Sequence, residues 1–300
     1  MKIRAVFKEA QRDIFARRGL VGALYLVNVI VGVVVMLPMI LLLNEMATSP
    51  LAGKLVTSVQ LDTLWELMQE HGSAFGQSMR YIFFFGFLYI VLQTFLAGGI
   101  VGILAHEPRF QLRIFLHESG MFFGRFFRLS LLSLPMLLLF VILFGLTCVL
   151  PLVNLSADLL PPAQNRVFLV SLALFVIFVS FWNMIFDYAK VLIAIEDKKS
   201  SWGGFWAAVK FIATHFRRTT VLYFINLIIL LTGLGASIFL ISYFGSDATP
   251  AIFLTLVVQQ FTIIFRLWMK ISFIASSLHV VRYKDPEIPS VKHLFTPHSP

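Results

Sequence analysis

The sequence predicts an all-α membrane protein with six transmembrane helices. Hydrophobic residues make up 59% of the 300 residues and charged residues only 13%, about half the charged share of a soluble domain. The charges gather in short clusters between long uncharged stretches, each long enough to cross a bilayer. The formal net charge of +9 comes from basic residues that border these stretches. That placement favours an anionic membrane surface over nucleic acid as their partner.

Six apolar stretches are expected to span the membrane: 20–43, 81–105, 129–153, 167–195, 219–244 and 251–281. The first is longer than the apolar core of a cleavable signal peptide, so we expect it to be retained. The sixth is interrupted by Arg266 and Lys270, each costing about 2.5–3.5 kcal/mol at a helix centre. Its apolar residues outweigh that cost, and we expect both cations to be paired or to extend toward an interface.

The lysines and arginines predict the orientation. With the N-terminus inside, 19 of the 24 lie in or beside the N-terminal segment, the segments near 106–128 and 187–218, or the C-terminal tail. Cytoplasmic segments carry this kind of excess. We therefore predict a protein of the bacterial inner membrane with both termini in the cytoplasm. In the external segment 44–79, the stretch 61–72 is expected to form a surface helix or, alternatively, a lid over a binding site.

The six predicted spans are arranged as an internal repeat. We expect one domain, 1–285, built from hairpins 1–108, 109–198 and 199–285, followed by an irregular proline-containing cytoplasmic tail, 286–300. A shift of 90 residues brings Phe126 onto Phe216 and Glu107 onto Asp197. Two spans return the chain to its starting side, so the hairpins must be parallel. Transporters are more often built from inverted repeats, although parallel ones also occur.

Each hairpin is expected to begin with a basic amphipathic helix on the cytoplasmic face. Apolar residues recur at helical spacing in 3–15 and again in 202–216, with a serine N-cap at 200 or 201. Such a helix either orients the following span or docks a cytoplasmic partner. The cations expected to meet lipid headgroups are Arg4, Lys8, Arg12, Arg17, Arg18, Arg128, Lys210, Arg217 and Arg218.

Two segments carry a family resemblance. The motif THFRRTTVLYFINLIILL follows a span that ends in DYAKVLIAIEDKKS. Together these segments resemble the bacterial six-span proteins related to the glycerophosphodiester phosphodiesterase membrane domain, over nearly the whole chain. The resemblance implies the six-span architecture alone. No phosphodiesterase catalytic domain is recognisable in the sequence, so neither an activity nor functional residues are implied.

Ionisable residues inside spans are the main lead to a site, because burying them without a partner is costly. Asp187 and Lys190 are three residues apart and therefore within one helical turn. We expect a cluster of Asp187 with Lys190, Lys270 or Arg266. It either pins the fourth span to the sixth or lines a polar pathway. In the second span, Gly98 and Gly102 form a small-residue contact face.

No catalytic or metal-binding motif is found. The pairs His106–Glu107 and His117–Glu118 are separated by Pro108, and the HExxH spacing is absent. The single cysteine, Cys148, rules out an intrachain disulfide. P-loop, GxSxG and GxGxxG patterns are also absent. We therefore predict no catalytic residues, no metal site and no cofactor.

The sequence favours a non-enzymatic scaffold or accessory subunit. Its expected partners are membrane lipids with anionic headgroups, and a membrane-protein partner or a second copy of the chain. The main alternative is a transporter or lipid-translocating protein with a polar pathway near Asp187. A lipid-modifying enzyme that uses dispersed loop residues is the third possibility.

Overall fold

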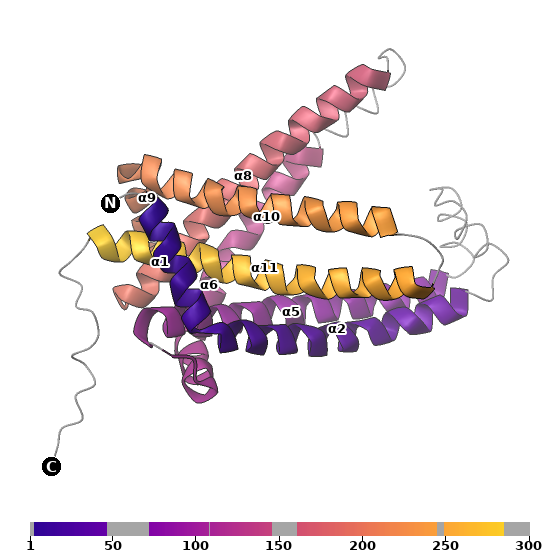
Figure 1. Ribbon diagram of the computed structural model, residues 1–300, viewed down its shortest axis with the longest axis horizontal. Coiled ribbons are helices and arrows are strands. Elements are labelled where there is room, and N and C mark those ends of the chain that lie inside the picture. The colour runs from indigo at the N-terminus through magenta and orange to yellow at the C-terminus, as the bar shows by residue number, and fades with distance from the viewer. Residues whose placement is uncertain (1–2, 47–71, 108, 146–160, 245–248, 285–300) are drawn as a thin grey trace. The chain divides into compact units, whose positions relative to one another are not determined.

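The computed structural model describes residues 3–46, 72–107, 109–145, 161–244 and 249–284, and every regular element there is helical (Figure 1). The α-helices are α1 (Ile3–Ala16), α2 (Arg18–Met46), α5 (Gly72–His106), α6 (Leu112–Phe144), α8 (Pro161–Ile195), α9 (Ser201–Thr214), α10 (Phe216–Phe244) and α11 (Thr249–Lys284). All but α1 and α9 are long and apolar enough to cross a membrane. Within the described ranges, the prediction of six candidate spans is confirmed.

The second predicted hairpin, 109–198, differs from the expectation at its start. An amphipathic stretch followed by a separate span was expected, but α6 is one continuous helix from Leu112 to Phe144. No proline lies between residues 112 and 134 to break it, and Gly120 and Gly124 are accommodated within the helix. The expected surface helix around Trp65, Cys148 and the tail 286–300 lie outside the described residues.

The chain forms two compact units, one of residues 1–21 and 94–300 and the other of residues 22–93. In the smaller unit, α2 and the first part of α5 are joined by a hydrogen bond in which the Tyr89 hydroxyl donates to Oδ1 of Asn28, at 3.1 Å. The larger unit holds α1, the end of α5, and α6 to α11. It contains most of the described polar contacts between helices.

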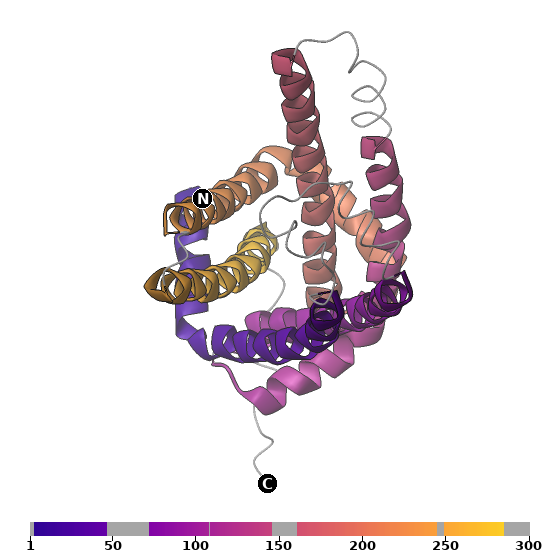
Figure 2. The ribbon, with the colours of Figure 1, turned by 90° about the vertical axis from the view of Figure 1, so that its right-hand side faces the viewer.

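The core of the larger unit is the second half of α11. Every residue from Ile271 to Leu278 is buried, whereas a helix on the surface of a bundle buries only one face. This stretch is covered on its different sides by α1, α8 and α10. Figure 1 shows α10 and α11 running side by side, and in both ribbon views α1 crosses α11 steeply (Figures 1 and 2).

Small residues let the start of α6 pack closely on the end of α5. A Cβ atom added at Gly102 would come within 2.5 Å of Cβ of Glu118, and one at Gly98 within 3.2 Å of Cβ of Phe122. Gly99 faces the side chains of Ser119 and Phe115 in the same way. The contact face predicted around Gly98 and Gly102 therefore lies against α6.

The short helix α9 packs on α8. Ser200 caps its N-terminus by accepting a hydrogen bond from the backbone N–H of Gly203, at 3.2 Å. Gly204 lies against Ile193 of α8, so closely that a Cβ there would approach Cδ1 of Ile193 to 2.7 Å. On the opposite side, Trp202 and Trp206 are exposed. An exposed pair of tryptophans is typical of a helix at a membrane–water interface.

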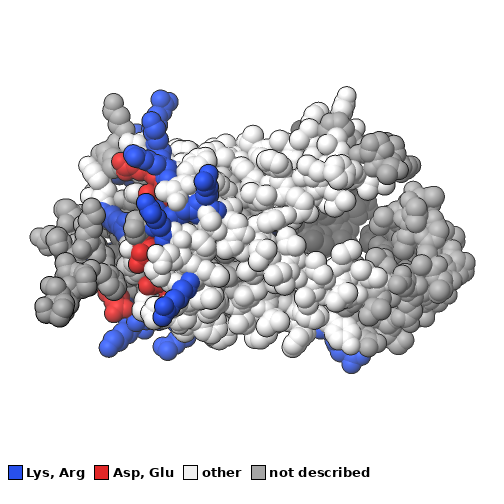
Figure 3. All heavy atoms as spheres, turned by 60° about the horizontal axis from the view of Figure 1, so that its bottom comes forward, with Lys and Arg blue, Asp and Glu red and all other residues white. Residues whose placement is uncertain are grey.

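The charged side chains of the larger unit gather at one end of its helices. Figure 3 shows lysines, arginines and carboxylates in one band, next to a long surface without charge. The uncharged surface beside it belongs to the candidate spans.

Candidate functional site

A network of side-chain hydrogen bonds ties α1 to α10 and α11. Gln11 of α1 donates from Nε2 to the hydroxyl of Ser272, at 2.7 Å, and its Oε1 accepts from the indole N–H of Trp268, at 2.8 Å. The Ser272 hydroxyl in turn donates to Oδ1 of Asn226, at 2.6 Å. Asn226 is fully buried, and its Nδ2 donates to the carbonyl of Leu222 at 3.0 Å. Every polar group in this network has a hydrogen-bond partner. The network therefore fixes the position of α1 without leaving an unpaired polar group in the core.

A second set of polar contacts holds the charged edge of α1. The carboxylate of Asp13 lies 3.0 Å from Nε2 of His279 on α11 and 3.5 Å from Nη1 of Arg17. The hydrogen bond to His279 and, more weakly, the charge of Arg17 lower the pKa of Asp13 despite its partial burial. Arg17 also donates from Nε to the carbonyl of Glu107, at 2.8 Å, and Arg282 donates to the carbonyl of Ala105. These bonds satisfy one carbonyl in the last turn of α5 and one directly after its end.

The predicted intramembrane cluster is present in part. Lys190 donates from Nζ to Oδ1 of Asp187, at 3.1 Å, and both side chains are largely buried. Lys270 of α11 is near enough to both to interact with their charges. The hydroxyls of Tyr188 and Tyr223 belong to the same neighbourhood. The cluster thus links α8, α10 and α11.

Arg266 lies apart from this cluster. Its side chain is exposed on α11, and it makes no hydrogen bond or ion pair with another described residue. Of the cations expected to meet lipid headgroups, eight are exposed: Arg4, Lys8, Arg12, Arg18, Arg128, Lys210, Arg217 and Arg218. Arg17 is only 8% exposed and is used inside the protein, between α1 and α5. It is therefore placed to join helices and not to contact a headgroup.

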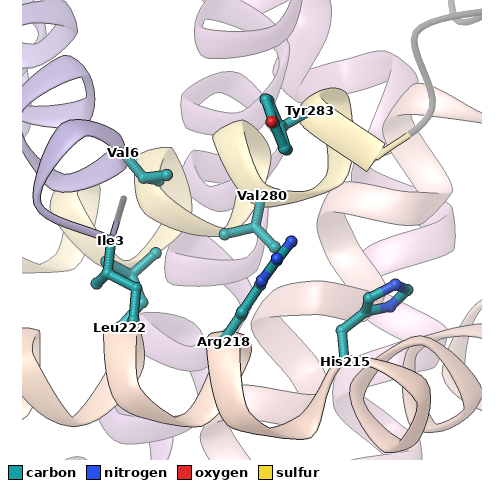
Figure 4. A pocket seen from close by; sticks show the side chains of 7 residues that line it. All are labelled: Ile3, Val6, His215, Arg218, Leu222, Val280 and Tyr283. Atoms are coloured by element: carbon teal, nitrogen blue, oxygen red, sulfur yellow. The ribbon is translucent and has the colours of Figure 1, made fainter. Parts of the chain in front are cut away.

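Two hollows flank α1 where it crosses α10 and α11. The larger is an open groove of about 480 Å³ with an aromatic lining. The smaller lies between Val6, Arg218, Leu222, Val280 and Tyr283 among others, and Figure 4 shows Arg218 extending from α10 toward α11 across it. Its volume of about 30 Å³ suits one or two water molecules. The groove alone is large enough for an organic ligand.

The histidines and carboxylates form no metal centre among the described residues. Nδ1 of His106 lies 3.3 Å from Oε2 of Glu118, so α5 and α6 each contribute one half of a single polar pair. This pairing joins His106 to Glu118 instead of to its chain neighbour Glu107. It closes the contact between α5 and α6 next to Gly102.

Sequence reasoning missed the role of Gln11 and of the Asp13–His279 pair. Gln11 lies between Phe7 and Phe15 on the apolar side of a basic helix, and a polar residue in that position is a signal for a buried hydrogen bond. Asn226 is a polar residue within a predicted span, and such residues commonly form interhelical hydrogen bonds. Its partners could not be identified, because they depend on which face of α11 meets α10.

Comparison of the chain with protein-family models, with curated proteins and with solved structures finds no match.

Proposed function

We propose that this protein is a non-enzymatic membrane scaffold or accessory subunit, which engages membrane lipids and presents its amphipathic helices to a membrane-protein partner. One observation carries the proposal. α1, the start of α6 and α9 each bury one face on a candidate span and leave an opposite cationic or aromatic face exposed. Polar groups inside the described bundle are used to join helices.

We infer that the spans form three parallel hairpins of one repeated design. In each, an amphipathic stretch precedes two spans and packs on the last span of another hairpin. Three contacts support this: α6 on α5, α9 on α8, and α1 on α11. The matched acidic positions also have related contacts, since Arg17 bonds the carbonyl of Glu107 and Arg125 pairs with Asp197. In the third of these contacts, the first helix of the chain packs on the last.

The exposed faces point to a cytoplasmic surface in a bacterial inner membrane. The charged band of the larger unit carries the exposed cations expected to meet anionic headgroups (Figure 3). On α9, the exposed Trp202, Trp206 and Lys210 lie on one side of the helix. This face is suited to the membrane surface and to a partner that approaches along it.

The proposal is tested by capture of the tagged chain from native membranes in mild detergent. A scaffold retains a stoichiometric protein partner, and Trp206→Ala combined with Lys210→Gln on the exposed face of α9 releases it. Arg80→Gln, at an exposed position of the smaller unit, is the matched control and keeps the partner. Retention by both variants, or purification of the chain without any partner, contradicts the proposed function.

A transporter is the second candidate, and the Asp187–Lys190 pair is the observation that favours it. Charged groups inside spans often mark ion or proton pathways. Asp187 lies eight residues before the end of α8, about 12 Å along the helix axis. If it belongs to a pathway, purified protein in liposomes moves a solute or lipid, and Asp187→Asn abolishes movement while the protein remains folded.

A further inference from the structure

The larger hollow beside α1 is lined by side chains of three helices, and most of them are aromatic. Five of its lining residues are aromatic: Phe7 and Phe15 from α1, and Phe261, Phe265 and Trp268 from α11. Ile229 of α10 closes the other side. Gln11 is its one polar lining residue, and both ends of its amide are bonded to α11. A ligand there therefore meets apolar surface and must itself be apolar where it enters the groove.

The groove has a defined wall. The rings of Phe15 and Trp268 meet edge to face with their centroids 4.5 Å apart. On the other side, the ring of Phe265 lies directly on Gly233 of α10, at a distance that leaves no room for a Cβ. The absence of a side chain at Gly233 thus lets the Phe265 ring lie against α10, where it forms one wall of the groove. An open space of about 480 Å³ remains.

The location of the groove identifies its occupant as a lipid chain. Phe261, Phe265 and Trp268 belong to the candidate span Ala251–Tyr283, and Ile229 belongs to the candidate span Phe216–Tyr243. Phe261 is 72% exposed, so the groove opens away from the bundle. In a membrane, a groove that opens sideways from a span faces acyl chains, which are the apolar chains present there.

The charges beside the groove select an anionic headgroup. Lys8 follows Phe7 and Arg12 follows Gln11, so each cation lies about 100° around α1 from a groove residue. Both are exposed, as is Arg266, which follows Phe265 on α11. The acidic residues of α1 lie elsewhere, since Asp13 pairs with His279 and Glu9 approaches the same ring to 4.0 Å. Positive charge is thus concentrated on the groove side.

We propose that the groove between α1, α10 and α11 binds an acyl chain of an anionic phospholipid, with the lipid phosphate held by Lys8 and Arg12. Both cations extend from α1, which Gln11 holds in place. The same helix therefore contacts both the headgroup and the acyl chain. The proposal deepens the lipid engagement of the proposed function, and rests on its placement of α1 at the membrane surface. A bound lipid would then form part of the α1 surface.

The test is a lipid titration of the delipidated, full-length protein, read by native mass spectrometry. Phosphatidylglycerol and phosphatidylcholine with identical chains are compared. Wild type binds one phosphatidylglycerol at least about tenfold more tightly than phosphatidylcholine, because both lipids carry a phosphate but the choline cation of phosphatidylcholine opposes the charges of Lys8 and Arg12. Lys8→Gln with Arg12→Gln reduces phosphatidylglycerol to the phosphatidylcholine level. Equal affinity of wild type for the two lipids overturns the proposal.

A matched pair of variants on α10 tests the groove itself. Ile229→Trp fills the groove and is expected to weaken the binding of both lipids by about tenfold or more. Ile228→Trp places the same ring on the adjacent exposed position, which does not line the groove, and keeps wild-type binding. Equal lipid binding by the two variants overturns the proposal. So does a dimeric wild type that Ile229→Trp converts to a monomer, because the groove then holds a second copy.

A second measurement covers the case in which Ile229→Trp fails to fold. Phosphatidylglycerol with brominated acyl chains quenches a tryptophan that it touches. The fluorescence difference between wild type and Trp268→Phe should show saturable quenching, and its absence overturns the proposal. Loss of the protein partner with lipid binding intact would count against the scaffold role alone. Partner retention without lipid selectivity would count against this site alone.

Discussion

Gln11 of α1 and Trp268 of α11 are joined by a hydrogen bond of 2.8 Å, in which the indole N–H donates to the amide oxygen. The same amide donates to Ser272 one turn further along α11. One side chain therefore sets both the position and the rotation of α1 on its neighbour, because two bonds to residues on successive turns are lost together if α1 rotates or slides.

Replacement of Gln11 is expected to release α1. Gln11→Leu keeps the size and the apolar surroundings but leaves the Trp268 N–H without its acceptor, which costs about 1–3 kcal/mol of unfolding free energy. The measurement is an SDS titration of purified protein followed by circular dichroism. Ala5→Gln, at an exposed position of the same helix, is the control and should unfold like wild type. Equal stability of Gln11→Leu and wild type would show that the network does not hold α1.

Gly102 is expected to tolerate no side chain. Gly102→Ala forces a Cβ to within 2.5 Å of Cβ of Glu118, an atom near the backbone that cannot move aside without moving α6. The overpacking should cost about 1–3 kcal/mol. Gly124→Ala, on α6 with nothing within 4 Å of the added atom, should be neutral. A stability difference between these two variants of less than about 0.5 kcal/mol would contradict the close contact.

Asp187 and Lys190 are expected to be energetically coupled. Asp187→Asn leaves Lys190 without its carboxylate partner, and Lys190→Met leaves the carboxylate without its cation, so each single change is destabilising. The double variant should lose less than the sum, with a coupling energy of about 0.5–3 kcal/mol. The same cycle with Lys270→Met tests the third member. Additive losses in both cycles would mean that the charges act independently.

Acidification is expected to weaken the docking of α1 through Asp13. Because folding lowers the pKa of Asp13, its ionised form stabilises the folded chain. This contribution is complete well above the ordinary value of 3.8 and is lost as the pH falls through the lower folded-state pKa. The thermal midpoint of Asp13→Asn should therefore fall less than that of wild type between pH 6 and pH 3. Arg17 and His279 contact this carboxylate and Glu9 approaches the His279 ring, and all three are unchanged in this comparison.

The proposed orientation is tested by cysteine labelling in intact cells. In a background with Cys148→Ala, Arg4→Cys on α1 should resist a membrane-impermeant maleimide applied from outside and react after permeabilisation. Arg80→Cys at the start of α5 should react in intact cells. Both positions are exposed, so a failure to label reports the membrane side. The reverse pattern would overturn the placement of the N-terminus in the cytoplasm.

The spans and the local contacts were predictable, because they depend on neighbouring residues. Long uncharged stretches identify the six candidate spans, and the spacing of Asp187 and Lys190 predicts that they meet. Contacts between distant segments were not predictable. Arg17 is a basic residue next to a predicted span, which is where a headgroup-binding residue is expected. In the structure it instead donates a hydrogen bond to the carbonyl of Glu107. The role of Arg17 depends on where α5 ends, and the periodicity of residues along α1 carries no information about that.

The helix boundaries show the same difference between features set by local sequence and features set by distant contacts. The break at His215, between α9 and α10, was recognisable from the basic run that follows an amphipathic stretch. The continuity of α6 was not, although its sequence has a similar pattern. Its first turns are covered by the glycine face of α5, and this tertiary contact favours an unbroken helix where local sequence predicts a separate element.

The buried second half of α11 has a consequence for biogenesis. Gln11 and its partner Ser272 are 261 residues apart, so α1 leaves the ribosome long before the surface that receives it exists. At about 5–20 residues per second, α1 waits on the order of 13–50 s with its apolar face uncovered. The nascent chain must shelter that face in the lipid interface or on an insertion factor, and the fold closes only when the last helix arrives. Synthesis that stops before α11 leaves a cationic amphipathic helix exposed, which offers quality control a direct sign of an unfinished protein.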